Sequence, residues 1–187
     1  YIIKSLRKRR GHKTHKKMKY DNKLIKAEFE KNLEEAKKAL TSLSFCKTPE
    51  VDKLLKGWVF EQTVAKCLLD EFNNNRIKIE QQFKFSSFEE QEGKKSEGTA
   101  DLEIDYNDRK YLVEIKHSGI FSKGDTEKYK KYRKLIEKNK FQYLYLSLKE
   151  THEPFAKECR EVFGTENVFI LDVDGDWERF IESIINN

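Results

Sequence analysis

Residues 101–116 alternate between apolar and polar side chains. An alternation with a period of two is typical of half-buried β-strands, and here it covers two segments, 101–106 and 110–116. Between the segments, Asn107 and Asp108 are residue types that tolerate the positive φ of a two-residue hairpin turn. The pattern therefore predicts an antiparallel hairpin.

The turn fixes the register of this hairpin, because paired residues in an antiparallel ladder keep a constant sum of residue numbers. The predicted pairs are Tyr106–Arg109, Asp105–Lys110, Glu103–Leu112, Asp101–Glu114 and Thr99–Lys116. Directly opposite side chains have Cβ atoms about 5 Å apart, and like charges placed in this way are destabilising. The facing carboxylates of Asp101 and Glu114 therefore need a compensating group.

A divalent cation is one such group. Hard cations such as Mg²⁺ take oxygen ligands, commonly one or two carboxylates together with water and phosphate oxygens. Lys116 lies two residues beyond Glu114, on the same face and roughly 7 Å along the strand. There it can polarise an attacking water or neutralise a phosphate. The alternative is a solvated sheet face, which we favour for the neighbouring charges Glu103, Asp105 and Lys110.

Upstream, residues 49–72 repeat apolar side chains at steps of three and four, which predicts an amphipathic helix. Thr48 is a suitable N-cap and Pro49 a suitable first residue. The apolar stripe consists of Val51, Leu54, Leu55, Trp58, Ala65, Leu68, Leu69 and Phe72. Glu61 falls on this stripe, and a buried carboxylate is costly unless it is paired or bound to a cation. The alternative is a glutamate at the edge of the stripe that reaches water.

The remaining pattern predicts an α/β fold. A strand at 77–85 and a polar loop precede the hairpin. After it come a helix at 124–138, a strand at 141–148, a helix at 151–164, a strand at 167–173 and a helix at 176–185. The last two strands follow helical crossovers, so they are predicted to run parallel. We therefore expect a mixed five-stranded sheet flanked by helices. The expected domains are a basic arm (1–20), an N-terminal helical extension (21–47) and a core domain (48–187).

The hairpin resembles the catalytic motif of the PD-(D/E)xK, or restriction-endonuclease-like, superfamily of nucleases. Asp101 stands at the motif aspartate, and Glu114, Ile115 and Lys116 stand at the E-x-K, while Ala100 replaces the usual proline, which is not a ligand. The thirteen-residue step from the aspartate to the glutamate is similar to that of archaeal Holliday-junction resolvases and of nucleases from archaeal viruses. The resemblance implies a restriction-endonuclease-like core.

The same resemblance implies a set of catalytic and metal-binding residues. Glu61 resembles the glutamate that often completes the metal site from the first core helix of these nucleases. With Asp101, Glu114 and the main-chain carbonyl of Ile115, it would hold Mg²⁺ or Mn²⁺. Lys116 would orient or activate the water that attacks the phosphorus. Junction-cleaving relatives act as dimers, so a homodimer is also implied.

Basic residues are concentrated at the start of the chain. The first twenty residues hold nine of the 38 Lys and Arg and no acid, so the formal charge of +5 divides into an arm of +9 and a remainder of −4. Such a block often binds nucleic acid, and the alternative is a solubilising tail. The predicted nucleic-acid contacts in the arm are Arg7, Lys8, Arg9, Arg10 and Lys13. Those on the helix at 124–138 are Lys128, Lys130 and Lys134, for which a solvated basic face is the alternative.

Apolar residues between the arm and the core domain also recur at steps of four and three. They are Phe29, Leu33, Ala36, Leu40 and Leu43. This spacing allows a short coiled-coil seam between two subunits. The alternative is a helix that docks on its own domain.

The composition of the whole chain excludes several classes of protein. With 37% hydrophobic and 12% aromatic residues, wholesale disorder is excluded. No segment approaches the roughly 18 apolar residues of a membrane span, and no secretory signal is visible. We therefore expect an intracellular protein, in the cytoplasm of a prokaryotic host or of a virus-infected cell. Cys46, Cys67 and Cys159 are odd in number and far apart, which indicates neither a disulfide scaffold nor a zinc ribbon.

Residues and resemblance together favour an endonuclease that acts on DNA and depends on Mg²⁺ or Mn²⁺. Nothing in the sequence looks like a base-reading module, which favours recognition of nucleic-acid shape, such as a branched junction or a single strand. Two other classes stay open. One is a catalytically silent nucleic-acid-binding protein with a nuclease-like fold, and the other is a protein-interaction module that docks through the helix at 22–44.

Overall fold

The structure is a computed structural model, which describes residues 18–40, 48–73, 77–88, 98–119, 121–152 and 155–186. Several residues singled out in the sequence lie outside the described ranges. These are Arg7, Lys8, Arg9, Arg10 and Lys13 of the basic arm, together with Leu43 and Cys46. The described fold therefore lies almost entirely in the residues after the arm.

The centre of the fold is a five-stranded mixed sheet in which the strands lie in sequence order. The strands are β1 (Lys78–Lys84), β2 (Thr99–Tyr106), β3 (Arg109–Lys116), β4 (Gln142–Ser147) and β5 (Val168–Ile170). β2 is antiparallel to both β1 and β3, whereas β4 is parallel to β3 and β5 is parallel to β4. The mixed sheet and its two parallel crossovers are therefore confirmed.

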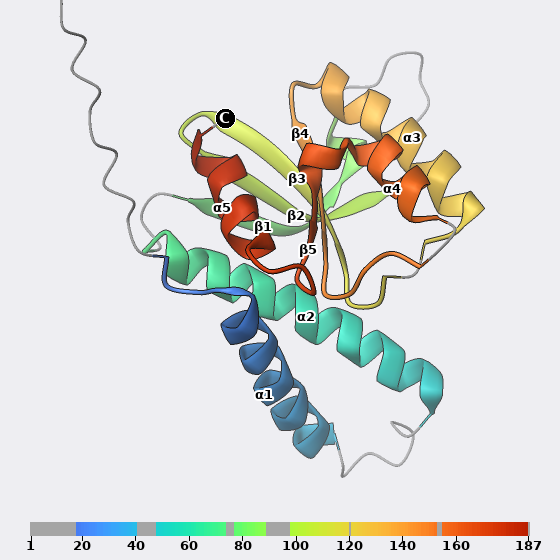
Figure 1. Cartoon of the computed structure of the whole chain (residues 1–187). Helices are drawn as coiled ribbons and strands as arrows, with labels where there is room; N and C mark the ends of the chain where they lie inside the picture. Colours follow the sequence, from blue (N-terminus) through green and yellow to red (C-terminus); the bar gives the residue numbers. More distant parts are fainter. Residues whose placement is uncertain are drawn as a thin grey trace, which may run out of the picture.

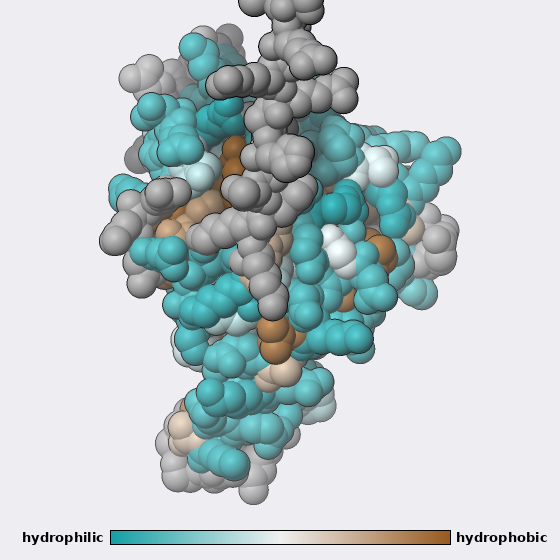
Figure 2. Space-filling view, turned by 60° about the vertical axis from the view of Figure 1, so that its left-hand side comes forward, coloured by the Kyte–Doolittle hydropathy of each residue, from teal (hydrophilic) through white to brown (hydrophobic). Residues whose placement is uncertain are grey.

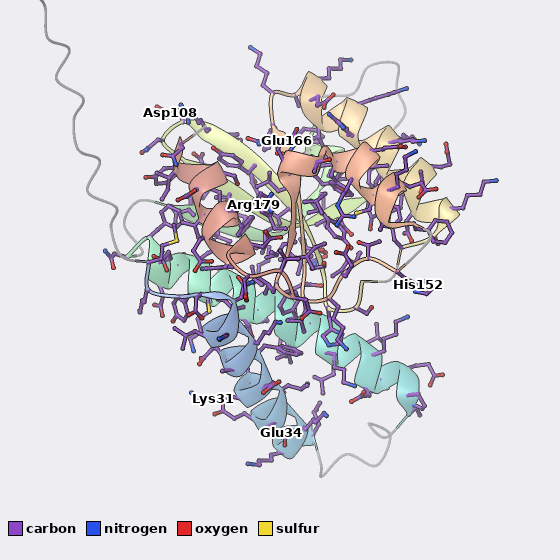
Figure 3. All side chains as sticks on the ribbon, viewed as in Figure 1. Lys31, Glu34, Asp108, His152, Glu166 and Arg179 are labelled. Atoms are coloured by element: carbon purple, nitrogen blue, oxygen red, sulfur yellow. The ribbon has the colours of Figure 1, made fainter. Side chains whose placement is uncertain are left out.

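The tip of the hairpin between β2 and β3 is formed as predicted. Asn107 and Asp108 have φ values of 51° and 64°, the left-handed conformation that both central residues of a type I′ turn require. The register next to the turn is also as predicted, and it begins with Tyr106 opposite Arg109. Asp108 is labelled in Figure 3, where it marks this tip.

The other end of the hairpin differs from the prediction. The ladder between β2 and β3 ends with Leu102 opposite Val113. Two predicted pairs beyond it do not form. They are Asp101–Glu114 and Thr99–Lys116. Instead, β2 continues along β1 and β3 continues along β4, each to the end of the strand. Because each strand follows its outer neighbour, the hairpin opens into a fork.

Helices cover both faces of the sheet. Within the described residues they are α1 (Asn22–Leu40), α2 (Pro49–Glu71), α3 (Lys123–Lys138), α4 (Ala156–Phe163) and α5 (Asp176–Asn186), with short 3₁₀ turns at Phe85–Ser87 and Thr165–Asn167. Figure 1 shows α1, α2 and α5 on one side of the sheet and α3 and α4 on the other. Two hydrophobic clusters fill the two interfaces, one under each group of helices.

α2 begins as predicted but presents a different face at its start. The Thr48 side chain accepts a hydrogen bond from the Val51 N–H, and Pro49 lies in the first turn. Leu54 and Trp58, predicted to face the core, are 72% and 57% exposed. The buried face passes through Val59, Phe60, Thr63, Val64 and Cys67, and it includes Ala65, Leu68 and Phe72 as predicted. Two overlapping stripes satisfy the same steps of three and four, and only contact with the sheet and α1 selects between them.

α1 packs on its own chain. Phe29 and Leu33 are buried in the same cluster as residues of α2 and the sheet. Phe29 meets Phe60 of α2 edge to face, with ring centroids 5.5 Å apart. Two residues of the predicted coiled-coil seam are therefore covered within the chain, as the alternative of a docked helix requires. A homodimer stays a prediction and would need another surface.

One face of the molecule is largely hydrophilic. Figure 2 shows a face on which hydrophilic residues predominate and hydrophobic patches are small. Among the described residues, the large hydrophobic side chains that are exposed are Leu24, Leu54, Trp58, Val173 and Ile185. In the part of the chain that the structure describes, no helix combines the length and the apolar character needed to cross a membrane.

A buried asparagine connects the start of α1 to the segment between β5 and α5. The Asn22 side-chain amide donates to the main-chain carbonyls of Leu171, at 2.9 Å, and of Val173. Its carbonyl oxygen accepts from the Trp177 N–H at 2.8 Å. Since Asn22 is only 5% exposed, these bonds take the place of water for three main-chain groups.

Asn22→Ala should lower the free energy of unfolding by about 2 kcal/mol or more, because it leaves main-chain donors and acceptors unpaired at a buried position. Urea denaturation measures this change. Lys23→Ala, at the exposed neighbouring position, is the matched control and should change stability by less than about 0.5 kcal/mol. Equal losses in the two variants would show that Asn22 does not connect these segments.

Candidate active site

The candidate catalytic residues lie at the fork between β2 and β3. The Asp101 carboxylate accepts a hydrogen bond from the main-chain N–H of Ile115, with 2.6 Å between Oδ2 and N. This side-chain bond follows directly after the last ladder pair, Leu102 with Val113. The fork is at the end of the hairpin opposite the tip, which the label of Asp108 marks in Figure 3.

Asp101 is an acid in an unfavourable environment. Burial raises its pKa most, and the negative charges of Glu114 and, less strongly, Glu61 raise it further. The positive charge of Lys116 and the hydrogen bond from Ile115 lower it, and the result is a pKa of about 7. Near neutral pH, the carboxyl group is therefore divided between its protonated and ionised forms. At the fork, the charges of Glu61, Glu114 and Lys116 therefore all act on Asp101.

Glu114 is 4% exposed, and hydroxyl and ammonium donors from three residues surround its carboxylate. The Lys116 ammonium group and the Tyr129 hydroxyl each lie 2.5 Å from Oε1. The Tyr143 hydroxyl lies 3.5 Å from Oε2. Tyr129 belongs to α3 and Tyr143 to β4, so this carboxylate is held from the face of the sheet that α3 covers.

Lys116 provides the positive charge of the cluster. Burial alone would lower its pKa, but the negative charges of Glu114 and Asp101, together with the hydrogen bond to Glu114, raise it above the ordinary value. The side chain is 31% exposed. The ammonium group is therefore protonated at neutral pH and keeps access to solvent.

Glu61 reaches the same cluster from α2. Burial raises its pKa, the charge of Lys116 lowers it and that of Glu114 raises it. Its Oε2 accepts a hydrogen bond of 3.3 Å from the side-chain amide of Gln82 on β1. Glu61 is therefore within electrostatic reach of the other acids, and its part as a metal ligand stays a prediction.

Gln82 was not predicted as a residue of the site, because in the sequence it is one more polar residue of an alternating strand. Its φ of 57° is uncommon for a residue other than glycine. The ladder of β1 and β2 omits Gln82 and Asp101, although pairs form on both sides of them. Leu102 packs in one hydrophobic cluster and Ala100 in the other, so the alternation of β2 reverses at Asp101. The distortion of β1 thus coincides with the position of the candidate catalytic aspartate.

The chemistry of the donor set suits a hard divalent cation. Asp101, Glu114 and Glu61 offer carboxylate oxygens, and Ile115 offers a main-chain carbonyl. The pKa of Asp101 is raised first by burial and then by the charge of Glu114, and the charge of Lys116 offsets these effects only in part. Within the described residues, however, no three side chains of His, Cys, Asp or Glu are gathered closely enough to hold a metal ion. In this arrangement Lys116 and Tyr129 both donate to Oε1 of Glu114.

The other charges of the hairpin pair with one another. The Lys110 ammonium group lies 3.3 Å from Glu103 and 3.9 Å from Asp105. Lys110 and Asp105 reach solvent, as expected for a solvated sheet face, whereas Glu103 is buried and departs from that expectation.

The basic residues of α3 lie at increasing distance from the cluster. The Lys128 ammonium group is 4.3 Å from the centroid of the Tyr129 ring, and Tyr129 contacts Glu114. Lys130 is 3.8 Å from Glu127 and is half exposed. Lys134 is exposed farther along the helix. The predicted basic surface therefore begins next to the candidate catalytic residues.

Comparisons with known proteins bear on the fold. No family model matches the chain, and no curated protein matches its sequence. Among solved structures, the complex of the restriction endonuclease PspGI with substrate DNA is similar, with a TM-score of 0.51 and 16% identity over 89% of this chain and 69% of that chain. The chain has the restriction-endonuclease-like fold. Protein VC1899 from Vibrio cholerae aligns with a TM-score of 0.48 and 12% identity over 74% of this chain, which spans 36% of that longer chain.

Asp101→Asn should stabilise the metal-free protein at neutral and alkaline pH. The pKa of Asp101 is about 7 in the folded protein against an ordinary value of 3.8, so the folded state holds a proton that the unfolded state releases. Stability should therefore fall as the pH rises from about 4 to about 7, and asparagine removes this loss. In EDTA, the advantage of the variant should be small at pH 4.5 and reach at most about 4 kcal/mol above pH 7.5.

Thermal or urea denaturation across this pH range measures the effect. Asp105→Asn, a substitution of the same type on the same strand, is the matched control. A stability difference between Asp101→Asn and the parent that does not change with pH would contradict the described environment of Asp101.

Proposed function

We propose that the protein is a metal-dependent endonuclease that hydrolyses phosphodiester bonds in DNA. The observation that carries the proposal is the set of acids around Lys116 at the fork, because burial and the neighbouring charge of Glu114 both oppose the ionised form of Asp101 that the fold places there. The fold supports it, since the restriction endonuclease PspGI, which is similar to this chain, was solved with its substrate DNA.

Asp101, Glu114 and Glu61, with the main-chain carbonyl of Ile115, would hold Mg²⁺ or Mn²⁺. When bound, such an ion supplies a water of lowered pKa and positive charge beside the scissile phosphate. The ionised form of Asp101 is favoured by any added positive charge, so cation binding should release the proton that this residue partly holds at neutral pH.

Lys116 serves as a charged donor in this proposal. Because its pKa is raised, it carries its proton at neutral pH. A protonated ammonium group can orient the attacking water and neutralise phosphate oxygens, but it cannot accept a proton from that water. Of the two parts expected for Lys116, orientation and activation of the water, the electrostatics favour orientation.

The basic face of α3 and the basic arm would hold the DNA backbone. Lys128 lies against Tyr129 next to the acid cluster, and Lys130 and Lys134 continue the basic surface along the helix. Contacts of this kind release counterions, so binding should weaken steeply with salt. Selectivity for branched or single-stranded DNA and action as a homodimer belong to the same proposal.

One observation favours a second candidate, a catalytically silent nucleic-acid-binding protein. Glu114 is bonded to Lys116 and Tyr129, and among the described residues no set of three metal-binding side chains is gathered. The acids would then serve the fold alone. Cleavage of DNA distinguishes the two candidates.

Cleavage assays on labelled four-way junction, single-stranded and duplex DNA, each with Mg²⁺, Mn²⁺ or EDTA, test the proposal. We expect products only with metal. Lys116→Met and Asp101→Asn should lower the rate by about 10²-fold or more, because each removes a charge that acts on the reacting groups. Lys110→Ala, on the same hairpin but away from the fork, is the matched control and should cleave at the parental rate.

Circular dichroism melting shows whether each variant folds. Metal-dependent cleavage at the parental rate in both folded variants would place the chemistry elsewhere in the chain. DNA binding without cleavage under any metal would favour the silent binding protein.

Tyr129→Phe should raise the Mg²⁺ concentration needed for half-maximal cleavage about 10-fold to 100-fold, because groups that orient a metal ligand contribute about this much to metal affinity. The rate at saturating Mg²⁺ should change less. Tyr143→Phe is the graded comparison and should have a smaller effect, since its hydroxyl lies 3.5 Å from Glu114 whereas that of Tyr129 lies at 2.5 Å. A larger effect of Tyr143→Phe would contradict the described contacts.

A further inference from the structure

Trp58 is a large aromatic side chain left exposed on α2. It is 57% exposed, whereas the other tryptophan of the chain, Trp177, is 0% exposed in the core. Leu54, one helical turn earlier, is 72% exposed. Packing among the described residues therefore gives no reason for an indole at this position.

Trp58 lies one helical turn from the candidate catalytic cluster. Residues three apart on an α-helix are neighbours on its surface, with a rise of about 4.5 Å between them. Glu61 is three residues after Trp58, and its carboxylate is within reach of the charges of Lys116 and Glu114. The indole therefore stands beside the cluster, on the outer face of the same helix.

Charges of both signs lie near this end of α2. Lys116 belongs to the cluster, and His117 follows it directly. Lys56 and Lys149 lie close enough to His117 for their charges to act on its ring. Asp52 opposes them and pairs with Lys56. Because the cluster also holds three acids, the charges here do not select the ligand, and the exposed ring beside the cluster is the feature that points to a base.

We propose that Trp58 stacks against an unpaired base, and that the substrate class is DNA with a single-stranded segment beside the scissile bond. This inference rests on the proposed nuclease function and deepens it. Stacking of a base on an aromatic side chain does not depend on sequence, since every base has a flat face. Bases inside a duplex are stacked on one another, so an intact duplex offers no free face to the indole.

The surroundings of the ring favour a base over a second copy of this chain. Trp58 forms one wall of a shallow hollow between α1 and α2. Its other lining residues are Asn32, Glu35, Ala36, Val59, Gln62 and Lys66. Most of these side chains are polar or charged, whereas the centre of a subunit interface is depleted of charged residues. A flat ring among polar groups provides stacking area for one base rather than an apolar patch for a subunit.

Tryptophan fluorescence measured in EDTA tests the proposal without cleavage. A single-stranded oligothymidine of about twelve nucleotides should quench the emission, and Trp58→Phe should abolish the quenching because Trp177 is buried. Its affinity should fall about tenfold or more in Trp58→Ala and less in Trp58→Phe, because phenylalanine can still stack. The affinity for a blunt duplex of the same length should be equal in all three proteins.

Leu54→Ala, which removes the neighbouring exposed side chain, is the matched control and should leave both affinities unchanged. Unchanged binding of the single strand by Trp58→Ala, or an equal loss on the duplex, would overturn the proposal. If the parent protein sediments as a dimer and Trp58→Ala sediments as a monomer, the ring belongs to an interface between copies. That result would overturn the proposal as well.

Failure of this inference and failure of the nuclease proposal are distinguishable. A protein that shows the quenching and the selective loss in Trp58→Ala but never cleaves would refute the nuclease activity and uphold the stacking. A protein that cleaves with metal but binds the single strand equally well with and without the indole would uphold the nuclease activity and refute the stacking.

Discussion

The separation of β2 from β3 beyond Leu102 and Val113 is the constraint on which the candidate site depends. Each strand keeps its outer partner to the end, β2 with β1 and β3 with β4, so the two cannot continue their own ladder. The main-chain N–H of Ile115 would then lack a partner in a buried region, which is costly. The Asp101 carboxylate supplies that partner at 2.6 Å and comes to lie beside Glu114.

Closing the fork with a carboxylate concentrates negative charge at this end of the hairpin. Lys116 compensates part of it by its contact with Glu114 at 2.5 Å. The remainder is visible in the raised pKa values of Asp101 and Glu61, for which burial is the first cause and the charge of Glu114 a further one. The metal-free cluster therefore takes up protons at the position where added cations would act.

Features that depend on near neighbours in the chain could be predicted from the sequence, and features set by distant contacts could not. The alternation over 101–116 and the Asn107–Asp108 turn specify the hairpin by themselves, and that part is confirmed. The fork was missed because the rule for an antiparallel ladder takes no account of outer strands. Tyr129 was not predicted as a residue of the site, because its hydroxyl meets Glu114 only through the packing of α3 on the sheet. No local pattern reports such a contact.

The identity of the residue at the fork carries a functional argument of its own. An asparagine at position 101 could accept the same hydrogen bond from the Ile115 N–H and would bring no charge into a buried place. Aspartate accepts that bond while its ionised form is opposed by burial and by Glu114. Aspartate therefore makes the same hydrogen bond as its neutral isostere at a higher cost in stability. Such a residue is typical of a position where the negative charge serves a function. The acids at the fork are therefore better explained by the binding of a cation than by the stability of the sheet.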